Sequence, residues 1–295
     1  MTTHMAQRVL ADEGLWRIDQ VDVRRPAPGL GELNQQNENI LVLLVAGLFF
    51  KHDGPRHRVM GTPNDAVLIG AGRPYRLSFP GGIGDSCLTV RFSNDALSQF
   101  LPVPELLPRL FTAPVLLPAH LLLARNILWR RFQSGEWDAM EVDELSGRLV
   151  EATLELVLAD VQNRRPNPPG RLGSIEAVKE AVALDPAHKW SLDALAKLAN
   201  TSPFHLSRLF RQIAGTSIYD YVVRTRLAAA LEFLLDTKMD LTAIGLEVGF
   251  SSHSHFTARF HSFFGMTPTA FRRAASSAIA AEMSRIVTAG KVQSC

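Results

Sequence analysis

The C-terminal third of the chain contains one pattern twice, and this repeat constrains the fold more than any other feature. The first copy reads SPFHLSRLFRQIAGTS and the second reads SHSHFTARFHSFFGMT. Superposing Gly215 on Gly265 pairs Phe210 with Phe260, and the upstream segments LDALAKLANTS and LTAIGLEVGFS align as well. Each copy is predicted to form a helix, a tight turn and a second helix. Helix-turn-helix units in tandem indicate a protein that recognises duplex DNA.

Composition sets the frame for the rest of the chain. A length of 295 residues accommodates two domains, and 46% apolar with 20% charged residues is typical of a soluble globular protein. The longest apolar run, residues 40–50, is too short to cross a bilayer and predicts a buried strand. The two thiols, Cys87 and Cys295, indicate neither a disulfide framework nor a zinc cluster. With no secretory leader in the opening residues, we expect a cytoplasmic protein without a membrane partner.

Charge is distributed unevenly along the chain. Residues 171–295 hold 14 Lys/Arg and 10 Asp/Glu, whereas the preceding part holds 17 against 19. A moderately basic C-terminal part is compatible with phosphate contact.

The N-terminal part predicts a β-domain followed by helices. From residue 8 to about 100, short apolar runs alternate with turn sequences such as KHDGPRH and FPGGIGD at a spacing typical of a sandwich or barrel. Helical patterns follow over 119–132 and 142–160. In the second pattern, apolar side chains recur at three- and four-residue steps (Val142, Leu145, Leu149, Ala152, Leu156 and Ala159). This stripe predicts either a helix that covers the β-domain or a dimer seam.

A proline-rich segment, NRRPNPPG at 163–170, marks the domain boundary because it cannot continue a helix. We therefore expect an α+β protein with two domains. The first, residues 1–165, holds the β-structure and helices at about 119–163. A linker at 166–173 leads to an all-α domain at 174–275, and residues 276–295 form a frayed helix or a disordered tail.

Within the repeat, serines are placed to cap helices. Ser191 and Ser202 precede the two helices of the first copy, and Ser252 precedes the second helix of the second copy. Ala196 and its counterpart Gly245 stand where the paired helices approach each other closely. Between the copies, residues 217–236 lack Gly and Pro and predict a helix of roughly 28–30 Å. This is close to the spacing of about 34 Å between successive major-groove faces of B-DNA.

The segment from Ile175 to Arg273 resembles the DNA-binding domain of the arabinose-regulator (AraC/XylS) family of bacterial transcription factors. The resemblance rests on HLSRLFRQIAGTS, YVVRTRLAAALEFL and AIGLEVGFSSHSHFTARFHSFFGMTPTAFRR. The N-terminal pattern is similar to the cupin-like β-barrel that senses effectors and dimerises in this family. The resemblance implies a non-enzymatic regulator whose partners are double-stranded DNA, a second copy of the chain, a small-molecule effector and, for an activator, RNA polymerase.

Carried over by position, the resemblance implies which side chains contact base edges. They are Phe204, Ser207 and Arg208 in the first copy and His253, Ser254, His255 and Ala258 in the second. Arg208 is the strongest candidate because a guanidinium can bind guanine O6 and N7 together. Where the family commonly has an arginine, this chain has Ala258, and the arginine is Arg259, rotated by about 100° along the helix toward a phosphate. Further phosphate-contact candidates are Thr201, Arg211, Gln212 and Arg272, and Arg226 is interpreted as structural.

The β-domain could hold a metal or an effector. His52, Asp53 and His57 are closely spaced, but Tyr75 stands where a metal-binding cupin has a further histidine, so we expect neither a metal nor a cofactor. Candidates for lining an effector pocket are Trp16, Phe50, His52, Tyr75, Arg76 and Arg91, and the arginines among them favour an acidic effector. Two alternatives remain open at this stage, an effector-independent architectural DNA-binding protein and a metal-dependent cupin enzyme fused to a DNA-binding domain.

Overall fold

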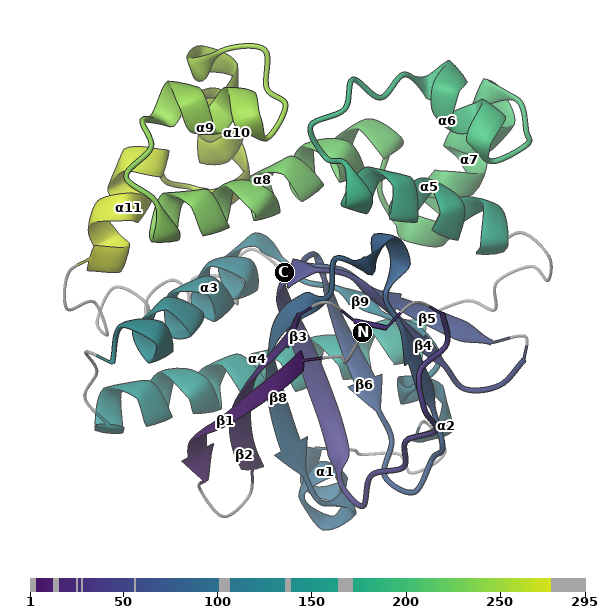
Figure 1. The fold of residues 1–295 in the computed structure, drawn as a ribbon, viewed down its shortest axis with the longest axis vertical. Helices are drawn as coiled ribbons and strands as arrows, with labels where there is room; N and C mark the ends of the chain where they lie inside the picture. Colours follow the sequence, from purple (N-terminus) through teal and green to yellow (C-terminus); the bar gives the residue numbers. More distant parts are fainter. Residues whose placement is uncertain are drawn as a thin grey trace. The chain divides into compact units, whose positions relative to one another are not determined.

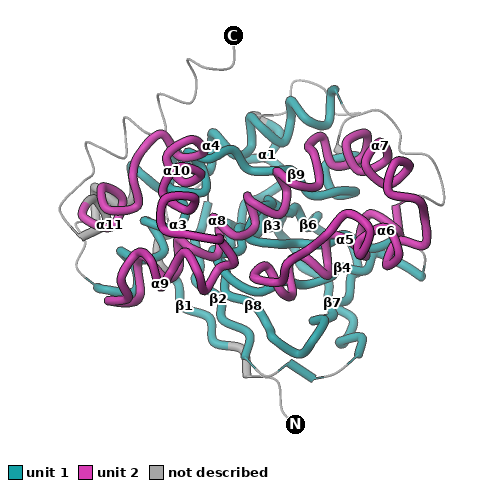
Figure 2. Tube along the Cα trace, turned by 90° about the horizontal axis from the view of Figure 1, so that it is seen from above, with its two compact units in different colours: residues 1–164, 274–295 teal, residues 165–273 magenta. Residues whose placement is uncertain are grey.

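The structure is a computed structural model, and it describes residues 4–12, 16–24, 26–27, 29–55, 57–100, 107–135, 139–163 and 172–276. The chain divides into two compact units, coloured separately in Figure 2, with breaks after residues 164 and 273. The first unit is rich in β-structure and the second is helical (Figure 1). The predicted tail from 277 onward and the linker up to 171 lie outside the described residues. The helix α5 begins at Leu172, so residues 172 and 173 belong to it and not to the predicted linker.

The first unit contains two antiparallel sheets. The larger has the order β1-β2-β8-β3-β6-β9 and the smaller the order β5-β4-β7. Their strands are β1 (His4–Asp12), β2 (Trp16–Arg24), β3 (Asn39–Gly47), β4 (Phe49–His52), β5 (Arg58–Gly61), β6 (Asp65–Ile69), β7 (Arg76–Ser78), β8 (Asp85–Phe92) and β9 (Val115–Leu116). The larger sheet ends in two edge strands, β1 and β9, so it is open. The predicted β-structure is confirmed, whereas closure into a cupin-like barrel is not.

One core of this unit lies between the two sheets. It takes every second residue of the central strands because successive side chains of a strand point to opposite faces. Its buried members come from both sheets and from the segment before β7: Val21, Val23, Ile40, Val42, Leu44, Phe49, Val59, Val67, Ile69, Tyr75 and Cys87. We call the sheet face that carries these residues the inner face.

Helices flank the larger sheet of the first unit. They are α1 (Asn94–Phe100), α2 (Leu107–Leu110), α3 (Ala119–Ser134) and α4 (Ala139–Asn163), with a 3₁₀ turn at Pro80–Gly82. The predicted helices at 119–132 and 142–160 are thus confirmed as α3 and α4. The buried face of α4 differs from the predicted stripe, however. Leu145 and Leu149 are buried, but farther along the burial passes to other residues (Val150, Leu154, Val157 and Val161), and Ala159 is exposed.

The second unit consists of seven helices among its described residues. They are α5 (Leu172–Leu184), α6 (Leu192–Leu198), α7 (Pro203–Ala214), α8 (Ile218–Asp236), α9 (Leu241–Glu247), α10 (His253–Phe264) and α11 (Pro268–Ser276). Helix α8 lies between the pair α6–α7 and the pair α9–α10 (Figure 1). The two helix-turn-helix units predicted from the repeat are therefore present.

Candidate nucleic-acid interface

The first helix-turn-helix unit is defined by its caps and its turn. The Ser191 hydroxyl accepts a hydrogen bond from the Ala194 N–H, and the Ser202 hydroxyl accepts one from the His205 N–H. Such side-chain caps satisfy backbone donors that a helix start leaves unpaired. Between the helices, Asn200 has a φ of 50°, the left-handed conformation in which asparagine is tolerated better than most residues.

The second helix-turn-helix unit repeats this construction with different residues. Gly249 has a φ of 95° at the position of Asn200, and the Phe250 N–H donates to the Gly245 carbonyl at 2.8 Å. In the first unit the equivalent bond runs from the Thr201 N–H to the Ala196 carbonyl at 2.9 Å. The turn of the second unit is one residue longer before its capping Ser252. Both turns are therefore set by the same hydrogen bond across a left-handed residue.

The two helices of each unit cross at a small residue. Gly245 is buried in α9, and a Cβ added there would lie 3.0 Å from the Phe256 Cβ. Ala196 is 2% exposed at the same place in the first unit. The aromatic residues of α10 then continue the core, with Phe256, Phe260 and Phe264 buried. Phe263 is only half-buried, with the Arg224 guanidinium 5.2 Å from its ring centre.

The connector helix α8 also stabilises the first helix-turn-helix unit. Arg226 donates from Nε to the Pro186 carbonyl at 2.8 Å and from Nη2 to the His188 carbonyl at 2.9 Å, across the loop between α5 and α6. The predicted structural role of Arg226 is therefore consistent with its contacts. At 19 residues, α8 has a length of about 28 Å.

Helix α7 exposes a polar and cationic face that lacks acidic residues. Phe204 is 81% exposed at the start of this helix, an unusual position for a phenyl ring. Ser207, Arg208, Arg211 and Gln212 are exposed on the same side. The side chains of Arg208 and Arg211 make no hydrogen bond or ion pair with any residue that the structure describes. The face therefore presents two uncompensated cations and one apolar group.

Helix α10 exposes a different set. His253, Ser254 and Ala258 are exposed, so three of the four predicted base-contacting positions are accessible. The fourth, His255, is half-buried; its Nδ1 lies 3.0 Å from the Ser251 hydroxyl, and its ring packs edge-on to Phe250 at 5.3 Å. His255 is thus engaged in its own turn.

The predicted phosphate-contact residues divide into free and engaged side chains. Arg211 and Gln212 are exposed, and Thr201 is half-buried in the turn. Arg259 instead donates from Nη2 to the Tyr219 hydroxyl at 3.0 Å. Arg272 donates from Nε to the Leu234 carbonyl in the last turn of α8 at 3.3 Å. Tyr219 did not stand out in the sequence because its partner lies 40 residues away.

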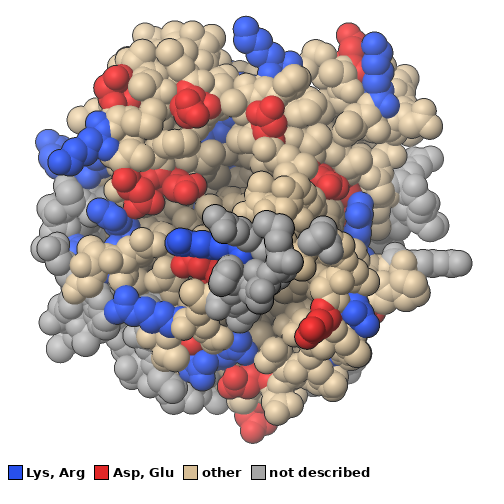
Figure 3. Space-filling view, viewed as in Figure 1, with Lys and Arg blue, Asp and Glu red and all other residues tan. Residues whose placement is uncertain are grey.

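Charge alone does not mark the interface. On the face drawn in Figure 3, Lys and Arg side chains are interspersed with Asp and Glu. The distinguishing feature is local and lies on α7 and α10, which contain Arg208, Arg211 and Arg259 but no carboxylate.

The structure does not bring the six predicted pocket residues together. Tyr75 lies in the core between the sheets, and Arg91 shares the inner face of β8 with Cys87. Phe50 and His52 face the opposite side of β4 and are paired with Ser78 and Arg76. The remaining candidate, Trp16, lies on the other face of the larger sheet. A Cβ added at Gly147 of α4 would lie 3.4 Å from its ring.

The histidines considered as metal ligands have other partners. The His52 Nε2 lies 2.8 Å from the Ser78 hydroxyl. His57 and Lys51 both contact the Asp53 carboxylate, at 3.3 and 2.8 Å. Within the described ranges, no three His, Cys, Asp or Glu side chains are grouped so that they could hold a metal ion. Nor does any described helix combine the length and apolarity needed to cross a membrane.

Comparison with known proteins agrees with this architecture. Residues 195–274 match the family model described as a helix-turn-helix domain. An uncharacterised HTH-type transcriptional regulator of Haemophilus influenzae is 31% identical over 96 residues, which is 32% of each chain. The RCS-specific HTH-type transcriptional activator RclR of Escherichia coli is 25% identical over 222 residues, covering 71% of this chain and 75% of that protein. The match thus spans only about a third of the length of the Haemophilus relative.

Among solved structures, one is a transcriptional regulator with an AraC-type DNA-binding domain from Chromobacterium violaceum. It is 28% identical, covers 38% of this chain and 99% of its own, and has a TM-score of 0.35. The fold and the site define the C-terminal unit as a tandem helix-turn-helix domain. Residues 195–274 form its helix-turn-helix domain, and the similar proteins are helix-turn-helix transcriptional regulators.

Proposed function

We propose that the chain is a DNA-binding transcriptional regulator that recognises an asymmetric site through α7 and α10. The observation that carries this proposal is the exposed face of α7, where Arg208 and Arg211 have no partner among the described residues. A duplex would supply the missing anions from its phosphates and the acceptors from its base edges.

The two helix-turn-helix units would contact successive major grooves. Arg208 would bind guanine, and Phe204 would contact a thymine methyl group beside it. The second unit offers His253, Ser254 and Ala258, which include no guanidinium. Arg211, Gln212 and Thr201 would contact phosphates, whereas Arg259 and Arg272 act first within the domain through Tyr219 and Leu234.

The N-terminal unit would serve as a sensor. Its two facing sheets support a cupin-like small-molecule site, and α4 supports either a cover for the sheet or a homodimer seam. The domain limits of 1–165 and 174–275 belong to this proposal. So do contact with RNA polymerase, for an activator, and a cytoplasmic location beside the chromosome. The role is regulatory and not enzymatic.

The proposal is tested by selection of DNA from a random duplex pool with the full-length chain. We expect one sequence to be enriched, with two conserved blocks about one helical turn apart. The variant Arg208→Ala should bind that sequence at least about tenfold more weakly. An unenriched pool after repeated rounds, together with an unchanged affinity of Arg208→Ala, would exclude the proposed function.

A further inference from the structure

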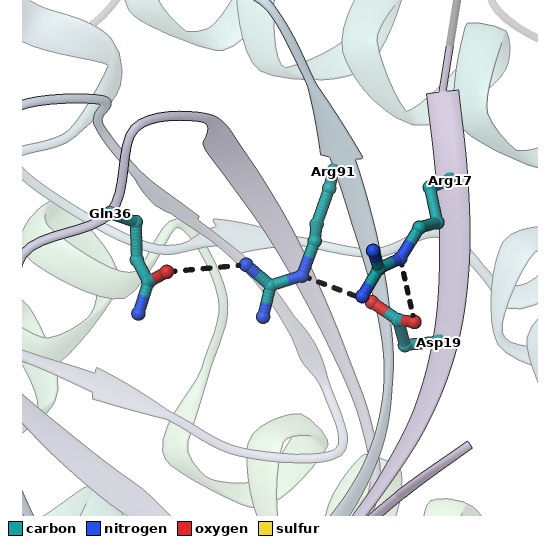
Figure 4. Close-up of polar contacts among 4 residues, drawn as sticks. All are labelled: Arg17, Asp19, Gln36 and Arg91. Carbon is teal, nitrogen blue, oxygen red and sulfur yellow. Dashed lines mark hydrogen bonds and ion pairs between the residues drawn. The ribbon is translucent and has the colours of Figure 1, made fainter. Parts of the chain in front are cut away.

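A cluster of polar side chains lies on the inner face of the larger sheet, between the two sheets of the N-terminal unit. It combines Arg17 and Asp19 from β2 with Thr89 and Arg91 from β8. Gln36 and Tyr75 approach from the segments that precede β3 and β7. Figure 4 shows the Arg91 guanidinium between Gln36 and Asp19, with Arg17 on the other side of Asp19. Burying polar groups at the end of an apolar core costs free energy unless they are hydrogen-bonded or paired.

The cluster contains two arginines that share the carboxylate of Asp19. Arg17 and Arg91 are directly opposite each other on neighbouring strands, an arrangement that is destabilising for like charges. A single carboxylate stands between them: Asp19 is fully buried and accepts from the Nε of each arginine at 3.0 Å. The Arg91 side chain is only 14% exposed.

Arg91 also has unused hydrogen-bonding capacity. Its Nη1 lies 3.4 Å from the Gln36 amide oxygen, a long contact, and its Nη2 has no partner among the described residues. A guanidinium normally presents two parallel donors to a carboxylate. Because Asp19 accepts only from Nε, Nη2 remains available to a second anion.

An independent observation places a second donor beside Arg91. Thr89 is directly opposite Asp19 and two residues from Arg91, so it shares their face. It is 6% exposed, and its hydroxyl has no hydrogen-bond partner in the described structure. An unsatisfied buried hydroxyl is costly unless a ligand completes it.

Apolar side chains border the cluster. Ile40 and Val42 are the β3 neighbours of Arg91 and Thr89, and both belong to the core between the sheets. Tyr75 is also part of this core; burial raises its pKa, opposed by a hydrogen bond with Gln36 and by the charge of Arg91. The phenol therefore stays neutral and adds no negative charge beside Arg91.

We propose that this cluster binds the carboxylate of a small organic acid with an apolar body, held by Arg91 and Thr89. The inference rests on the proposed sensory function of the N-terminal unit and names the chemical class of its effector. The competing interpretation is an ion-pair network that only joins β2 to β8.

The test measures the thermal stability of the full-length chain with butanoate and phenylacetate. Each acid is compared with its neutral amide at equal ionic strength. We expect the acids, but not the amides, to raise the Tm by roughly 2–4 °C at saturation, since a ligand stabilises only the state that binds it. Calorimetric titration of phenylacetate then supplies its Kd.

Four variants separate binding from structure. Arg91→Gln should weaken phenylacetate binding at least about tenfold, because charge-assisted hydrogen bonds are lost. Thr89→Val should weaken it severalfold while leaving the unliganded Tm equal or higher, since an unsatisfied hydroxyl is removed. Asp19→Asn, which removes the competing carboxylate, should strengthen it. Arg76→Gln is the control because Arg76 donates to the Gly31 carbonyl on the other face of the smaller sheet.

Equal effects of acid and amide, or an unchanged phenylacetate affinity in both Arg91→Gln and Thr89→Val, would overturn this inference. A chain that selects DNA but ignores both acids would refute the inference alone. A chain that selects no DNA would refute the regulatory function instead, so the two failures are distinguishable.

Discussion

Tyr219 and Arg259 join the connector helix to the second helix-turn-helix unit. Arg259 Nη2 donates to the Tyr219 hydroxyl at 3.0 Å, and the guanidinium carbon lies 5.2 Å from the centre of the phenol ring. Tyr219 is in the first turn of α8, directly after the first helix-turn-helix unit ends at Gly215. The contact therefore fixes α10 relative to the start of the connector and, through it, relative to α7.

Loss of this contact should affect binding to the complete DNA site more than binding to either half. Tyr219→Phe keeps the ring and removes the acceptor, so affinity for the complete site should fall by about two- to fivefold, as expected for a partly exposed hydrogen bond. Affinity for a duplex that retains only the block bound by α7 should not change. Fluorescence anisotropy with both duplexes measures the difference, and an equal loss on both would contradict a positioning role.

Arg208 and Arg211 should have separable effects on DNA binding. Arg208→Ala should cost about 1–3 kcal/mol and relax the preference at one base pair. Arg211→Ala should weaken binding to all sequences alike and reduce the slope of log K against log salt by about 1. Titrations at several salt concentrations check both outcomes. If the two variants behave identically, the assignment of base and phosphate contacts is wrong.

Gly245 should resist even a methyl group. Gly245→Ala places a Cβ 3.0 Å from the Phe256 Cβ, so we expect a loss of roughly 1–3 kcal/mol from overpacking. Gly173 of α5 is the matched control, because a Cβ there meets no atom within 4 Å. Gly173→Ala should stabilise by up to about 1 kcal/mol. Denaturant unfolding of both variants gives the comparison, which fails if Gly245→Ala is as stable as the parent chain.

Asp85 should make stability depend on pH. Burial, and secondarily the charge of Asp22, raises the pKa of Asp85 to about 7. The folded chain then holds a proton that the unfolded chain releases near pH 4, so the free energy of unfolding falls as pH rises from about 4 to 7 and levels off above that. The total loss is on the order of 4 kcal/mol, given about 1.4 kcal/mol per pKa unit and a shift of about three units.

The variant Asp85→Asn should remove this fall, because its side chain stays neutral throughout. Asp22→Asn should move the transition to lower pH by removing a repulsive charge. Thermal unfolding at a series of pH values measures all three chains. A parent chain and an Asp85→Asn variant with parallel curves would show that Asp85 ionises normally.

Local features of the helical C-terminal unit were predictable from sequence because they depend on nearby residues. Ser191, Ser202 and Ser252 each cap a helix. Each accepts a hydrogen bond from the backbone N–H three residues further along the chain. The small residue at the helix crossing followed from the repeat itself, since Gly245 aligned with Ala196.

Contacts between distant residues were not predictable in the same way. The pocket prediction combined Phe50 with Tyr75. Tyr75 lies in the core between the sheets, whereas strand alternation turns Phe50 to the other face of the smaller sheet, and only the pairing register reveals this. In α4 a seven-residue stripe was expected, but an α-helix turns every 3.6 residues, and the buried face moves from Leu149 to Val157 and Val161. The hydrogen bond from Arg259 to Tyr219 joins residues 40 positions apart, and no pattern in the repeat predicts it.

The central claim is that two similar units bind two different DNA blocks, and one measurement tests it most directly. The affinity of the full-length chain and of Arg208→Ala is measured on the selected duplex and on versions with each block randomised in turn. We predict that Arg208→Ala becomes insensitive to randomising one block, the guanine-containing block, and keeps its sensitivity to the other. A uniform loss of affinity in Arg208→Ala with both blocks still discriminated, or a selected site with two identical blocks, would contradict it.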